Sequence, residues 1–208
     1  MHDYGENVKF WDKIAKRYDL ITIKLSRDYP ALIQRIVNDV NGAVNVLEVA
    51  TGTGLIAMEL AGNVGRIEAI DLSSKMITLA KSKISKDHLN NIHFTVQSAY
   101  NLDFKDDHFD LAVCSNALHC MADPQKAISE IRRVLKDNGI LIAPTYCHGV
   151  NWRSRLLSRA MSITGFKVYN RFGMDEFIDL IKSSGFTIIK KDVSNDFIPL
   201  VYVVAKSV

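Results

Sequence analysis

Apolar and polar positions along this chain form two alternating kinds of block, which predict strands and helices in turn. From residue 44 onward, short apolar runs alternate with longer stretches that place apolar residues every three or four positions. The short runs predict buried strands and the longer stretches predict amphipathic helices. We expect strands at 44–50, 66–71, 92–97, 109–114 and 139–146, and helices at 54–62, 73–86 and 123–136. This alternation is typical of a doubly wound, Rossmann-like α/β fold with a mostly parallel sheet.

Both ends of the chain depart from the alternation. Residues 6–24 carry an apolar and aromatic stripe at helical spacing, and a second amphipathic helix precedes residue 44. Near the C-terminus, a predicted helix at 174–184 leads to apolar runs at 186–193 and 200–206, which predict an antiparallel hairpin. We therefore expect one domain over residues 1–208. Its parts are a helical cap at 1–43, a core at 44–146, an insert at 147–173, and a helix and hairpin at 174–208.

Composition and charge narrow the function classes. A net charge of +3 is too small to indicate nucleic acid binding. No run of about 18 apolar residues predicts a transmembrane helix. Three cysteines without metal-type spacing, and an N-terminus without a secretory signal, predict reduced thiols in a cytoplasmic protein. These properties indicate a globular protein that does not span a membrane, and they do not indicate its oligomeric state.

The stretch from Asn45 to Gly54 carries the chemistry. An apolar strand ends in Gly52 and Gly54, which suit a tight turn into a helix. Glycines let a ligand approach the backbone closely, and the following helix offers unpaired N–H groups. The sequence from Gly52 to Ala57 also fits the dinucleotide pattern G-x-G-x-x-A, so a nicotinamide or flavin enzyme is an alternative.

Two carboxylates bear on that choice. Glu48, at the strand end before the turn, would repel a pyrophosphate and attract a cationic ligand such as S-adenosylmethionine. Asp71 ends the second strand, where a carboxylate can accept hydrogen bonds from both ribose hydroxyls of either ligand. The alternative role for Asp71 is to cap the helix that follows.

Three motifs in order resemble those of the class I S-adenosylmethionine-dependent methyltransferases. They are the glycine-rich stretch 46–54 (VLEVATGTG), the fourth-strand segment 109–119 (FDLAVCSNALH), and the segment 131–139 (IRRVLKDNG) before the fifth strand. The resemblance implies a seven-stranded sheet whose last strand is antiparallel, with S-adenosyl-L-methionine as cofactor. The motif of nucleic acid amino-methyltransferases is absent from the fourth-strand segment, which argues against a nucleic acid substrate.

The same resemblance implies which residues contact the cofactor. Ala50 replaces a frequent glycine, and we expect its φ to stay negative. Ser98 replaces a frequent aspartate near the adenine. The implied cofactor residues are Tyr18, Glu48, Ala50, Thr51, Gly52, Thr53, Gly54, Asp71, Leu72, Met76, Ser98, Ala99, Tyr100, Asn116 and Ala117.

The acceptor side is predicted from fewer signals. Residues 10–19 (FWDKIAKRYD) resemble the opening of ubiquinone/menaquinone-type C-methyltransferases, in which this helix closes over the cofactor. His119, after the fourth strand, is the candidate general base; the alternative is a structural histidine. The residues predicted to face the acceptor are Trp11, Tyr146, His148, Trp152 and Arg171.

The insert at 149–173 mixes five basic residues with apolar ones and contains no acid. This mixture is typical of a substrate lid that binds an acid or touches a lipid surface, and equally of a solvated basic face. The predicted function is methyl transfer to a small, partly apolar or lipid-like acceptor. The alternatives are an NAD(P)-dependent oxidoreductase and a non-catalytic S-adenosylmethionine-binding subunit.

Overall fold

The computed structural model describes residues 8–25, 29–40, 42–87, 89–147, 150, 167–194 and 199–208. The strands are β1 (Asn45–Val49), β2 (Arg66–Asp71), β3 (Ile92–Val96), β4 (Phe109–Val113), β5 (Leu135–Ile142), β6 (Thr145–Tyr146), β7 (Phe186–Val193) and β8 (Leu200–Ser207). The helices are α1 (Val8–Ile14), α2 (Tyr18–Leu25), α3 (Tyr29–Val40), α4 (Leu55–Leu60), α5 (Ser74–Asp87), α6 (Pro124–Val134) and α8 (Met174–Ser183). Short 3₁₀ turns lie at Ala15–Arg17, Ala61–Asn63 and Leu118–Cys120.

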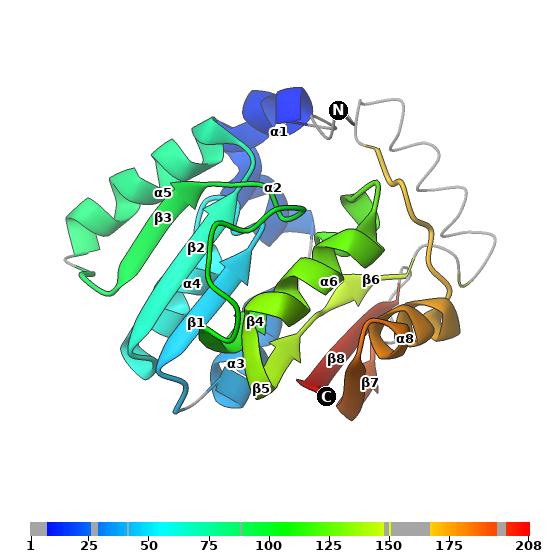
Figure 1. Ribbon diagram of the computed structural model, residues 1–208. Coiled ribbons are helices and arrows are strands. Elements are labelled where there is room, and N and C mark those ends of the chain that lie inside the picture. The colour runs from blue at the N-terminus through cyan, green and yellow to red at the C-terminus, as the bar shows by residue number, and fades with distance from the viewer. Residues whose placement is uncertain are drawn as a thin grey trace.

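The strands form one twisted sheet in the order β3-β2-β1-β4-β5-β8, with β7 beyond β8 (Figure 1). The strands from β1 to β5 pair in parallel, and β8 runs antiparallel to both β5 and β7. The predicted doubly wound fold class with its antiparallel last strand is confirmed. The described residues add one short strand to the predicted seven, because the two residues of β6 also pair with β8.

Helices cover both faces of the sheet because the central strands are apolar on both sides. Alternate residues of β1 enter different clusters: Leu47 packs with buried residues of α6 and α8, and Val46 packs with those of α3, α4 and α5. Figure 1 shows α6 and α8 in front of the sheet and α3 and α4 behind it. Strands buried on both faces read as near-continuous apolar runs, which is why the sequence pattern predicted a parallel sheet.

Most boundaries lie within one or two residues of the prediction, and three elements differ in how they end or are divided. The strand expected at 139–146 is divided into β5 and β6, because Pro144 has no N–H to continue the ladder. The helix expected to reach residue 136 ends at Val134, and β5 begins at Leu135 with an irregularity in its pairing with β4. The stripe at 6–24 is helical within the described residues, but a 3₁₀ turn at 15–17 divides it.

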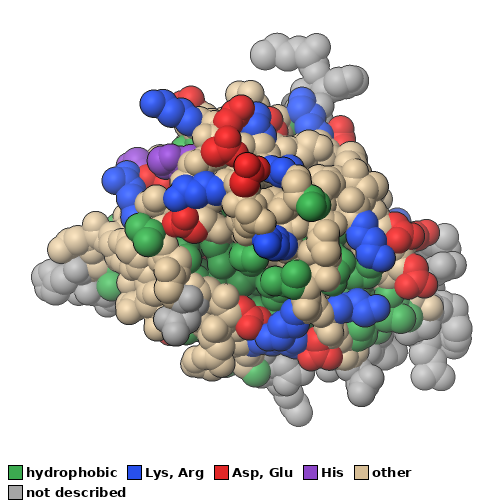
Figure 2. Space-filling model, turned by 60° about the horizontal axis from the view of Figure 1, so that its bottom comes forward, with side chains coloured by type: hydrophobic (Ala, Val, Ile, Leu, Met, Phe, Trp, Pro, Cys, Tyr) green, Lys and Arg blue, Asp and Glu red, His purple; other side chains and the backbone are tan. Residues whose placement is uncertain are grey.

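The parallel strands bring their carboxyl ends to one edge of the sheet, where α1 and α2 lie at the top of Figure 1. The opposite side, shown from below in Figure 2, presents acidic and basic side chains intermingled around apolar ones. That mixture gives no single-sign surface field. No helix in the described part of the chain is long and apolar enough to cross a bilayer.

Candidate functional site

A cavity of about 130 Å³ lies at the carboxyl ends of β1, β2 and β4, beneath the N-terminal helices. Ligands of open α/β sheets bind at this edge, next to the strand where the order reverses. The residues predicted from sequence that line the cavity are Trp11, Tyr18, Ala50, Gly52, Asp71, Leu72, Met76, Ser98, Ala99, Tyr100, Asn116 and Ala117. These predicted residues therefore lie together around one cavity.

The glycine turn is built from left-handed backbone. Gly52 has φ +58° and Gly54 has φ +80°. A Cβ on Gly54 would lie 2.5 Å from the Phe94 ring, so only glycine fits there. Ala50 also has positive φ, at +58°, which corrects our expectation of a negative value. The chain must turn sharply after β1, and the alanine takes a conformation that costs about 1–2 kcal/mol.

Asp71 joins the turn to the end of β2. Its Oδ2 accepts the Gly52 N–H at 2.9 Å, and its Oδ1 accepts the Ser73 N–H at 2.8 Å. Burial raises the pKa of the Asp71 carboxyl, and the two hydrogen bonds oppose that shift. Asp71 thus orders the backbone just before α5 while it lines the cavity, and the α5 cap is Ser73, whose hydroxyl accepts the Met76 N–H at 3.1 Å.

Glu48 lies apart from the cavity lining. Its side chain is buried, and its Oε2 accepts a 2.6 Å hydrogen bond from the Thr51 hydroxyl. Burial raises the Glu48 pKa to about 8, which favours the neutral acid at pH 7. The expected repulsion between a Glu48 carboxylate and a pyrophosphate is therefore not supported by the structure.

The residues that line the cavity do distinguish a cationic ligand from one that contains a pyrophosphate. Among its described residues Asp71 is the one carboxylic acid, and none is Lys, Arg or His. A pyrophosphate would find no cation there, whereas a sulfonium or an ammonium would meet a favourable potential.

The end of β4 supplies polar atoms that face the cavity. Asn116 has φ +53°, and its N–H donates to the Pro144 carbonyl at 2.8 Å. Within the described residues, Asn116 Oδ1 and Ser115 Oγ are buried and have no hydrogen-bond partner. Buried polar atoms normally have partners, so a ligand with polar groups fits this end of the cavity.

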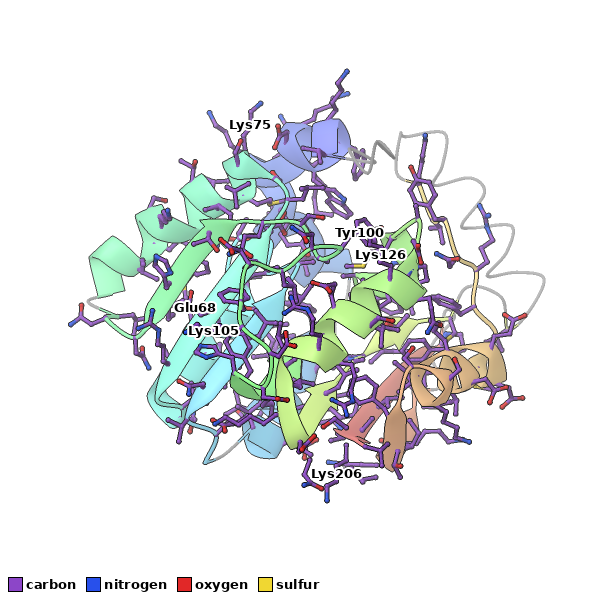
Figure 3. The ribbon with its side chains drawn as sticks, viewed as in Figure 1. Glu68, Lys75, Tyr100, Lys105, Lys126 and Lys206 are labelled. Atoms are coloured by element: carbon purple, nitrogen blue, oxygen red, sulfur yellow. The ribbon has the colours of Figure 1, made fainter. Side chains whose placement is uncertain are left out.

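Tyr100 forms another part of the cavity wall. Its hydroxyl accepts the backbone N–H groups of Ala122 and Asp123, at 3.0 and 3.4 Å, just before α6. In Figure 3 Tyr100 lies next to the start of α6, near Lys126. The Tyr100 ring is therefore held in place in the cavity wall.

The N-terminal helices close the cavity from above. Tyr18 Cε1 lies 3.4 Å from the position that a Cβ on Gly52 would occupy. Trp11 packs edge-on against Tyr18, with ring centroids 6.1 Å apart. Burial raises the Tyr18 pKa to about 12, so its hydroxyl stays protonated.

The other predicted residues lie elsewhere. Thr51, Thr53 and Gly54 are buried in the turn behind the lining. His119 is buried, with its ring centroid 6.4 Å from that of Tyr146, and neither residue is part of the lining. Arg171 borders a separate shallow hollow between α6 and α8. His148 and Trp152 lie outside the described residues.

Sequence reasoning missed part of the lining: Val8, Ile70, Ser73, Gln97, Ser115, Cys120 and Met121. Ser73 lies two residues after Asp71, so its place just past a strand end could have indicated it. Cys120 follows the predicted fourth-strand motif by one residue, so extending the motif would have found it. All three cysteines are free, and no cluster of metal-ligating side chains occurs in the described part of the chain.

Sheet order, glycine turn and strand-end carboxylate together define a Rossmann-like methyltransferase architecture. The family described as "Methyltransferase domain" matches residues 47–143. S-adenosylmethionine is the methyl donor of this family, and the residues of the cavity fit it.

The comparisons with individual proteins agree. The chain is 32% identical over 150 residues to the ubiquinone/menaquinone biosynthesis C-methyltransferase UbiE of Citrifermentans bemidjiense, covering 68% of this chain and 64% of that protein. It is 32% identical over 171 residues to the demethylmenaquinone methyltransferase of Paenarthrobacter aurescens, covering 78% and 66%. A Haloferax volcanii putative methyltransferase, solved in complex with the Trm112 activator, shares the fold with a TM-score of 0.76 and 17% identity. That alignment covers 95% of this chain and 97% of the other.

The chain therefore belongs to the class I S-adenosylmethionine-dependent methyltransferases. It spans 64% of the length of the first of these relatives.

Proposed function

We propose that this protein transfers a methyl group from S-adenosylmethionine to a small, partly apolar or lipid-like acceptor, with a quinol ring as the first acceptor to test. The observation that carries the proposal is the cavity at the carboxyl ends of β1, β2 and β4, whose one lining carboxylate is Asp71. The names of the two relatives, which act on quinone precursors, supply the acceptor class.

The lining divides into two ends. Asp71 and Leu72 at the end of β2, Met76 in the first turn of α5 and Ala99 after β3 suit the adenosine. Around the end of β4, Ser115 and Asn116 offer unpartnered polar atoms to the methionine part of the cofactor. Cys120, Met121 and Trp11 form an apolar wall next to them. Apolar and aromatic walls with few polar groups favour an uncharged, flat acceptor.

The cofactor supplies the reactive methyl group when bound. The protein's own part is to align the acceptor and exclude water. Tyr18 on Gly52 and Trp11 above it cover the cavity for this purpose. For an acceptor that must lose a proton, we propose His119 as the base, with Tyr146 at its side. Acceptor contacts from His148, Trp152 and Arg171, and lipid contact through 149–173, remain predictions.

The experiment is direct binding followed by turnover. Calorimetry with S-adenosylhomocysteine and with NADH on the purified chain distinguishes the two cofactor classes. Turnover is then measured with S-adenosylmethionine and a reduced naphthoquinol, by mass spectrometry of the product. Micromolar S-adenosylhomocysteine binding with a product heavier by one methylene supports the proposal. Binding of NADH alone overturns it, and donor binding without transfer to any quinol or phenol favours the non-catalytic alternative.

A further inference from the structure

Residues 8–25 comprise α1, the 3₁₀ turn and α2 and form an N-terminal strap near the carboxyl ends of the parallel strands (Figure 1), where the cavity lies. The strap contributes Val8, Trp11 and Tyr18 to the lining. Yet no residue of α1 is buried, and in the 3₁₀ turn only Ala15 is. Since the apolar residues of α1 are only partly buried, polar contacts add to what holds the strap in place.

The first polar contact is made by Asp19. Its Oδ1 accepts a short hydrogen bond from the Thr53 hydroxyl in the glycine turn. Its Oδ2 accepts a 2.6 Å hydrogen bond from Lys83 Nζ of α5, and Lys83 also donates to the Thr53 carbonyl at 3.0 Å. The Asp19 and Lys83 side chains are partly exposed, at 34% and 28%. Asp19 directly follows Tyr18, so this contact sets where the tyrosine ring lies.

The second polar contact is made by Asp12. Its Oδ1 accepts a 2.5 Å hydrogen bond from the Ser73 hydroxyl. Ser73 Oγ in turn accepts the Met76 N–H at 3.1 Å and so caps α5. A carboxylate at a helix N-terminus is favoured by the helix dipole. Asp12 directly follows Trp11, so each lining aromatic of the strap has its own adjacent anchor.

We infer that Asp12 and Asp19 are positioning residues that hold the strap closed over the cavity, and that exchange of the S-adenosyl ligand requires both to release their hydroxyl partners. Neither carboxylate is part of the lining, so each acts through Trp11 or Tyr18. This inference rests on the donor half of the proposed function and is independent of the acceptor.

The test is the kinetics of S-adenosylhomocysteine exchange, followed by stopped-flow tryptophan fluorescence, with Trp11 as the reporter. The variants are Asp12→Asn, Asp19→Asn and the matched pair Thr53→Val and Thr53→Ser. Asp39→Asn is the control, because Asp39 bonds Lys190 and Tyr202 far from the strap in sequence. We expect Asp19→Asn and Thr53→Val to raise the dissociation rate about tenfold, with Thr53→Ser close to wild type.

The two rates together separate a strap from a merely structural role. An opened strap raises the association rate as well as the dissociation rate, whereas a damaged binding site leaves association unchanged or slower. Wild-type rates in Asp12→Asn, Asp19→Asn and Thr53→Val would overturn the inference. If Asp19→Asn does not fold, the comparison of Thr53→Val with Thr53→Ser tests the Asp19 contact instead. If the wild-type chain itself binds no S-adenosylhomocysteine, the proposed function fails instead.

Discussion

The Gly52 amide donates to the Asp71 carboxylate at 2.9 Å, so the glycine turn after β1 is bonded directly to the end of β2. The two residues are 19 positions apart in sequence and both line the cavity. A second bond, from the Ser73 N–H, orients the other carboxylate oxygen. Asp71 is therefore fixed before any ligand arrives, which lowers the entropic cost of binding one.

Replacing Asp71 by asparagine tests this arrangement. Asparagine keeps the shape but has one acceptor oxygen, so one of the two backbone N–H groups or a ribose hydroxyl loses its partner. We expect S-adenosylhomocysteine affinity to fall roughly 10- to 100-fold, measured by calorimetry. Asp39→Asn, which removes a comparable carboxylate from α3, should leave affinity unchanged. An unchanged affinity in Asp71→Asn would show that the carboxylate serves the fold alone.

The two turn glycines should respond differently to alanine. At Gly54 a Cβ would meet the Phe94 ring at 2.5 Å in addition to the left-handed backbone, and we expect a loss of roughly 2–4 kcal/mol of unfolding free energy. At Gly52 a Cβ would make an ordinary 3.4 Å contact with Tyr18, so the loss should be roughly 1–2 kcal/mol. Urea unfolding measures both. Equal losses would mean that packing against Phe94 is relaxed easily.

Ala50 offers the opposite change. Its φ of +58° is unfavourable for alanine, so Ala50→Gly should raise the unfolding free energy by about 0.5–1 kcal/mol after the entropic cost of glycine. Ala57→Gly, within helix α4, is the matched control and should lower it by at least about 1 kcal/mol. If Ala50→Gly is less stable than wild type, the packing of the Ala50 methyl group contributes more free energy than its left-handed backbone costs.

The proposed role of His119 as general base is tested by the effect of its replacement on kcat. We expect His119→Gln to lower kcat roughly 100-fold or more at neutral pH, while S-adenosylhomocysteine affinity stays within about twofold. Since His119 is buried beside Tyr146, the unfolding free energy of the variant must be measured in parallel. A variant that loses stability but keeps kcat would assign His119 to the structure.

The fold could be predicted from the sequence because helices and strands are marked by the pattern of apolar residues within each short segment. The strands are apolar on both faces, as Val46 and Leu47 show, so periodicity found them. Gly52 and Gly54 likewise mark the tight turn beside the cavity by their residue type and spacing alone. The orientation of Glu48 is different: it depends on which face of β1 meets α3 and α4, and on how completely those helices exclude water. The contacts of Asp12 and Asp19 join segments more than 30 residues apart, so no local pattern reveals them.

Glu48 gives the protein a predictable pH dependence. Burial raises its pKa from an ordinary 4.5 to about 8 in the folded chain. Between these two values the folded state holds a proton that the unfolded state has lost, so stability must fall as pH rises, by at most about 1.4 kcal/mol per pH unit. Above about pH 8 both states are ionised, and this contribution ends.

Glu48→Gln isolates the effect, because glutamine can still accept the Thr51 hydrogen bond but does not titrate. Denaturant unfolding from pH 5 to 9 should show the wild-type chain losing stability relative to the variant up to about pH 8, and a constant difference above it. Asp71, whose pKa burial also raises, titrates in both proteins, so the difference removes the part of its contribution that does not depend on Glu48. Parallel curves over the whole range would mean that Glu48 ionises normally and that water reaches it behind the glycine turn.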